Sequence, residues 1–77
     1  MRELKRSITI SGHRTSISLE PEFWEALRRC ASLRNQTVAA LVREIDALRR
    51  GRNLSSALRV WILHQALAGR GLSLPLL

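Results

Sequence analysis

The stretch His13-Arg14-Thr15-Ser16-Ile17-Ser18-Leu19 decides the fold, because it reads as a short strand in a chain whose later patterns are helical. It lies between Gly12 and Glu20-Pro21, and its β-branched residues alternate with small polar ones. Side chains on a strand alternate between its two faces, so one face is rich in hydrogen-bonding groups and the other is mostly apolar. The polar face carries Arg14, Ser16 and Ser18, and the other face carries Thr15, Ile17 and Leu19.

A lone strand can neither pair its own backbone groups nor bury its apolar face. We therefore expect the same strand of a second copy to pair with residues 13–19 as an antiparallel ribbon, with the helices packed beneath it. Ile8 and Ile10 alternate with polar residues in a second extended piece, but in the opposite phase, so the β region 7–19 must break at Gly12. Either the chain folds back there into a hairpin or the first piece is a flexible lead-in, and both alternatives stay open.

Three helical patterns follow. Residues 20–34 begin with a proline in the first turn, which a helix tolerates, and residues 37–49 begin with Thr37 as N-cap and carry the clearest amphipathic face. Residues 53–68 are apolar nearly all round, which a 77-residue chain can hardly bury alone, so we place this helix partly in a dimer interface. Residues 1–6 form a basic arm and residues 69–77 an apolar tail, and we expect 1–77 to be a single domain.

The charge balance is consistent with nucleic acid as a partner. The formal net charge is +7, from 13 Lys and Arg against 6 Asp and Glu, and Lys5 is the one lysine among them. Arginine suits bidentate contacts to phosphates and bases, although a genome rich in G and C produces the same bias. Two histidines and one cysteine far apart in sequence give no metal-site spacing. We find no catalytic set and no phosphate loop, and so expect no enzymatic activity and no cofactor.

The sequence also bears on location. The apolar stretches are far too short to span a bilayer, and Met1 to Lys5 leads into polar sequence rather than into the apolar core of a signal peptide. These features predict a cytoplasmic protein without membrane contact.

The strand followed by two helices, from Gly12 to Ile45, resembles the ribbon-helix-helix DNA-binding proteins of bacteria. The segments 12–16, 23–24 and 53–59 are similar to a group of short, mostly uncharacterised bacterial proteins of that family. The resemblance implies a mainly α fold in which an N-terminal β-strand pairs across a homodimer, here with an additional C-terminal helix. Asn35 stands near a position where many members have glycine, and asparagine can adopt the same left-handed conformation.

In that family the ribbon enters the major groove of double-stranded DNA, where alternate outward residues contact base edges. The matching positions here are Arg14, Ser16 and Ser18, whose guanidinium and hydroxyl groups can bond to bases. The N-terminus of the second helix binds a phosphate, and the matching positions are Thr37, Val38 and Ala39.

We therefore predict a sequence-specific transcriptional regulator, a repressor, that acts as a homodimer or as a pair of dimers. Two alternatives remain. One is the antitoxin of a toxin-antitoxin pair. The other is a protein-interaction dimer that does not bind DNA and whose helix 53–68 docks another protein.

Overall fold

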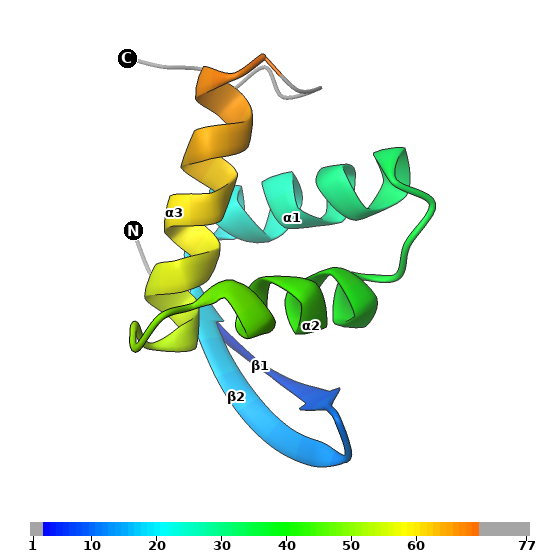
Figure 1. Cartoon of the computed structure of the whole chain (residues 1–77), viewed down its shortest axis with the longest axis vertical. Coiled ribbons are helices and arrows are strands. Elements are labelled where there is room, and N and C mark those ends of the chain that lie inside the picture. Colours follow the sequence, from blue (N-terminus) through cyan, green and yellow to red (C-terminus); the bar gives the residue numbers. More distant parts are fainter. Residues whose placement is uncertain (1–2, 70–77) are drawn as a thin grey trace.

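The computed structural model describes residues 3–69, which form a hairpin followed by three helices (Figure 1). The elements in chain order are β1 (Leu4–Ile10), β2 (His13–Leu19), α1 (Pro21–Leu33), α2 (Val38–Leu48) and α3 (Leu54–Leu67). Each helix lies one residue inside the range expected from the sequence at both ends, because the outer residues are its caps. Residues 1–2 of the expected arm and 70–77 of the expected tail lie outside the described residues.

Of the two alternatives left open at Gly12, the structure shows the hairpin. Ser11 and Gly12 both have positive φ, 51° and 82°, as the two-residue turns that match the twist of a β-hairpin require. β1 and β2 pair antiparallel over their whole length, from Leu4 opposite Leu19 to Ile10 opposite His13. Residues 4–6, which were expected to belong to the basic arm, are therefore part of a strand.

The structure supplies a partner strand for β2 within the chain. β2 pairs with β1 of the same chain along one edge, a partner that the sequence analysis had not assigned to it. A two-residue turn costs little loop-closure entropy, which favours this local pairing. On the other side of β2, the Ser18 N–H donates to Ser55 Oγ at 3.3 Å, and Arg59 Nη2 donates to the Ser18 carbonyl at 3.5 Å. At Ser18, both edges of β2 are thus occupied within one chain.

The core lies between the inner face of the hairpin and the three helices. The side chains that are fully buried there come from β2 and from all three helices: Ile17, Leu19, Leu27, Leu41, Val42, Leu58 and Ile62. α3 runs across both α1 and α2 and also contacts β2 (Figure 1). The chain thus buries by itself one side of α3, a helix that was expected to lie partly in a dimer interface. Leu63 and Leu67 on α3 nevertheless stay exposed.

Local hydrogen bonds connect the elements. Trp24 is buried in α1, and its Nε1 donates to the Leu4 carbonyl at 2.9 Å, which ties α1 to β1. Asn35 has a φ of 54°, the left-handed conformation expected for the residue between α1 and α2. Thr37 caps α2 by accepting a hydrogen bond from the Ala40 N–H at 3.0 Å, and Asn53 caps α3 in the same way through the Ser56 N–H at 2.8 Å.

The turn gives a first testable prediction. Ser11 adopts a left-handed conformation that costs most residues about 1 kcal/mol or more, and asparagine tolerates it better. We expect Ser11→Asn to raise the free energy of unfolding by about 0.5 kcal/mol and Ser11→Val to lower it by about 1–2 kcal/mol. Urea denaturation followed by circular dichroism measures both. A valine variant as stable as the native chain would contradict the turn geometry.

Candidate nucleic-acid interface

The outward face of the hairpin is polar and basic. Opposed residues in an antiparallel pair point to the same side of the sheet. Three consecutive outward pairs are Lys5 with Ser18, Ser7 with Ser16, and Thr9 with Arg14. We call these six residues the ribbon face; they comprise two cations, four hydroxyls and no carboxylate. All six are exposed except Ser18, which is half-buried.

The structure thus brings together the three residues predicted to contact bases. Arg14, Ser16 and Ser18 lie on the ribbon face because Ile17, between the two serines, and Leu19, which follows them, are fully buried on the opposite face. A register slip of one residue would move the isoleucine and the leucine to solvent, so burial of the inner face fixes the outward set. Within the part of the chain that the structure describes, Arg14 forms no ion pair, which leaves its guanidinium available to a ligand.

Sequence reasoning missed the β1 half of this face. Lys5, Ser7 and Thr9 were not proposed as site residues, although the reversed phase of the alternation on either side of Gly12 already contained the signal. In a two-residue hairpin, even positions before the turn share a face with odd positions after it. The odd residues of β1 therefore join Arg14, Ser16 and Ser18.

The second predicted set lies at the start of α2. The N–H groups of Val38 and Ala39 open the helix and have no intrahelical acceptor. Both residues line a hollow of about 250 Å³ together with Arg6, Ser7 and Arg28. An anion there would meet backbone N–H groups at the positive end of the α2 dipole, with cationic side chains beside them.

The residues at and around this hollow already make contacts within the chain. The Thr37 hydroxyl is engaged with the Ala40 N–H and does not line the hollow, so it orders the helix start. Arg28 pairs with Glu25 at 2.5 Å, whereas the Arg6 guanidinium lies 5.3 Å from the centre of the Trp24 ring, a cation–π contact. Ser7 belongs to both the ribbon face and the hollow, so the two predicted regions adjoin at β1.

An ion-pair cluster braces the end of β2 against α3. Arg59 Nε lies 3.0 Å from Glu20 Oε1, and Arg59 Nη2 lies 3.3 Å from Glu3 Oε2. A hydrogen bond from its own backbone, and then the Arg59 guanidinium, lower the pKa of Glu20 below its ordinary value of 4.5. This cluster holds the C-terminal end of the ribbon in place.

The lowered pKa predicts a pH dependence of stability. A carboxyl whose pKa is lower in the folded state stabilises the fold at pH above its unfolded pKa, and that contribution is lost as the pH falls through the folded pKa. We expect the free energy of unfolding to decrease as the pH falls below 4.5, and to decrease less in Glu20→Gln than in the native chain. Urea denaturation between neutral and acid pH tests this, and identical pH profiles for the two proteins would count against the pair.

The hairpin, the helices and the polar ribbon face agree with a match to a known protein family. The model of the ribbon-helix-helix domain matches residues 4–66, and the chain therefore belongs to this family, whose members are typically DNA-binding regulators that bind as dimers. The resemblance seen in the sequence is confirmed, as is the mainly α fold with a ribbon and an additional C-terminal helix.

Among solved structures, this chain is similar to an uncharacterized protein from Bordetella pertussis Tohama I. The two share 35% sequence identity with a TM-score of 0.72, and the match covers 90% of this chain and 60% of that one. This chain thus spans about 60% of the length of that relative. No curated protein matches the chain.

Neither a membrane span nor a metal cluster occurs within residues 3–69. No helix in this range is long and apolar enough to cross a membrane. Nor do His, Cys, Asp and Glu side chains in the same range gather in groups of three or more that could hold a metal ion.

Proposed function

We propose that this protein is a sequence-specific DNA-binding transcriptional regulator, a repressor, that inserts its ribbon into the major groove. The observation that carries the proposal is the ribbon face, on which two cations and four hydroxyls stand without a carboxylate. The major groove of B-DNA admits a two-stranded ribbon, and its base edges present the donors and acceptors that such side chains bind.

Each site residue has a role in this proposal. Arg14 bonds a guanine through both terminal nitrogens, and the hydroxyls of Ser16 and Ser18 donate to or accept from neighbouring bases. The N–H groups of Val38 and Ala39 hold a backbone phosphate, and Thr37 keeps that helix start ordered. The phosphate contact positions the ribbon, and the base contacts supply specificity.

The proposed regulator acts in the cytoplasm, where its DNA lies, as a homodimer or a pair of dimers. A two-fold dimer places one ribbon face on each half of a palindromic operator, so the half-site spacing follows from the geometry of the dimer. β2 already has its partner strand within one chain, so the two copies associate through surfaces other than the Ser18 end of β2.

Selection from a random pool of duplex DNA at moderate salt tests the proposal. The retained DNA is sequenced, and the affinity for any enriched motif is then measured against salt concentration. We expect a two-fold motif whose affinity falls steeply with salt, because neutralised phosphates release counterions. Retention without any enriched motif would contradict sequence-specific regulation and leave only non-specific binding.

A further inference from the structure

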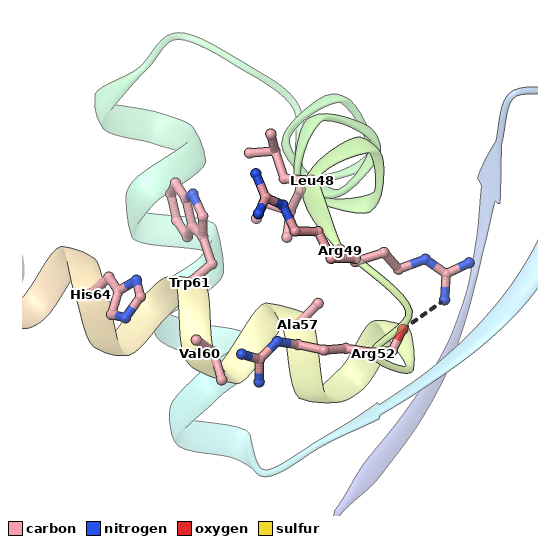
Figure 2. A pocket seen from close by; sticks show the side chains of 9 residues that line it. Leu48, Arg49, Arg52, Ala57, Val60, Trp61 and His64 are labelled. Carbon is pink, nitrogen blue, oxygen red and sulfur yellow. Dashed lines mark hydrogen bonds between the residues drawn. The ribbon is translucent and has the colours of Figure 1, made fainter.

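A hollow outside the proposed DNA interface lies between the end of α2 and the face of α3 (Figure 2). Its volume is about 350 Å³, and its apolar wall includes Ile45 and Leu48 of α2 with Val60 and Trp61 of α3. Trp61 also lines a second hollow of about 130 Å³, whose other walls include Leu33 and Cys30 of α1. Trp61 thus forms a wall of both hollows, and we call the surface that contains them the α3 groove.

Exposed leucines flank the α3 groove. Leu48 is 67% exposed and Leu33 is 62% exposed, although each stands beside a hollow that could receive an apolar group. Large side chains left this exposed next to a concave apolar surface are typical of sites where another protein binds. The shape suits an apolar helix face that places side chains on both sides of Trp61.

The rim of the α3 groove is cationic. Arg49, Arg50 and Arg52 border the larger hollow, and Arg34 borders the smaller one, where its guanidinium lies 5.7 Å from the centre of the Trp61 ring. No carboxylate among residues 3–69 lines either hollow. Asp46 neutralises Arg49 at 2.6 Å and Glu44 lies 3.7 Å from Arg34, but within the same range the structure places no ion pair at Arg50 or Arg52.

This charge decides between possible occupants. A second copy in a two-fold contact would bring the same basic patch against itself, with no carboxylate in either hollow to pair with its arginines. Phosphates of DNA would satisfy the arginines but would leave Leu48 and Trp61 without a partner. A segment that carries both carboxylates and apolar side chains can pair with the arginines of the rim and also cover the apolar floor.

We propose that the α3 groove binds an acidic amphipathic helix of a partner protein, with its leucine or aromatic side chains in the two hollows and its carboxylates on Arg50 and Arg52. The site shares no residue with the ribbon face or with the start of α2. The two sites adjoin at Arg49, which also lines a hollow beside Arg14.

Fluorescence anisotropy with a labelled synthetic peptide tests the proposal on the whole chain. The probe is a designed helix of about five turns with leucines along one face and glutamates elsewhere. Its control is a scrambled peptide of the same composition that lacks a continuous apolar face. We expect the amphipathic peptide to bind about tenfold more tightly than the scrambled one.

Matched variants locate the binding surface. Leu48→Ser should weaken binding about tenfold, whereas Leu63→Ser, which removes an exposed leucine of α3 that lines neither hollow, should change it less than about twofold. The double variant Arg50→Glu, Arg52→Glu should abolish measurable binding. The double variant Arg29→Glu, Arg43→Glu changes the net charge by the same amount at exposed positions outside the groove. This variant should retain most of the peptide binding.

Several outcomes would overturn the proposal. Equal binding of both peptides, or equal loss in both charge variants, would show only non-specific attraction to a basic protein. Loss of DNA affinity without loss of peptide affinity in Arg50→Glu, Arg52→Glu would assign those arginines to phosphates. Dissociation of a native dimer by Leu48→Ser, measured by sedimentation, would show that a second copy covers the groove.

Discussion

The variant with Arg14→Ala, Ser16→Ala and Ser18→Ala together is expected to lose about a hundredfold or more in affinity for the selected DNA while it remains folded. A good bidentate contact to a base discriminates by about 1–3 kcal/mol, and the hydroxyl contacts add to it. The affinity for an unrelated duplex should fall much less, because the variant loses one cation only. That loss lowers the slope of affinity against salt concentration by about 1. Anisotropy with the operator and with an unrelated duplex measures both quantities.

The opposite strand provides the matched control. Lys5→Ala, Ser7→Ala and Thr9→Ala remove the facing members of the same three pairs, again one cation and two hydroxyls. If β2 reads the bases, this variant keeps its preference for the operator. If the β1 variant loses the preference and the β2 variant keeps it, β1 is the reading strand and the assignment of Arg14, Ser16 and Ser18 is refuted. Circular dichroism of both variants checks that the hairpin still forms.

Leu58→Ala should lower the free energy of unfolding by about 2–5 kcal/mol, the cost of a cavity at a fully buried leucine. Leu58 is 0% exposed in α3, where it belongs to the core formed with the ribbon and the other helices. In a domain of this size each kcal/mol lowers the midpoint of thermal unfolding by about 4–8 °C. Thermal and urea denaturation give the values.

Leu63 on the same helix is the control for that experiment. It is 46% exposed, so Leu63→Ala should cost no more than about 0.5 kcal/mol. A Leu58→Ala variant as stable as Leu63→Ala would mean that α3 is an appendage of the domain. If Leu58→Ala is less stable than Leu63→Ala by the expected amount, α3 is part of the core and only its outer surface is available to a partner.

Local periodicity made most secondary elements predictable. Alternation along residues 13–19 predicted which side chains of β2 face outward, and burial of Ile17 and Leu19 agrees with it. Helical spacing and capping residues located the helix ends, because an N-cap such as Thr37 acts on N–H groups within three residues of itself. The positive φ of Asn35 was predictable for the same reason.

The partner strand and the full ribbon face were not predictable in this way. The alternation of residues 7–10 was visible, but only the fold shows that Ser11 and Gly12 make a turn tight enough for β1 to pair with β2. The ribbon face therefore includes Lys5, Ser7 and Thr9, which the sequence analysis had not assigned to it. The bond between Arg59 and Glu20, 39 positions apart, carries no sequence signal, since such distances follow from packing alone.

The amino-acid sequence by itself determined the faces of β2, the extents of the helices and the basic character of the protein, because these depend on neighbours within a few residues. Tertiary structure alone decided which strand pairs with β2, where the start of α2 lies relative to the ribbon face, and that Trp61 joins two hollows beneath a cationic rim. These features depend on contacts between distant segments, whose free energies are set by loop closure and side-chain packing rather than by any local pattern.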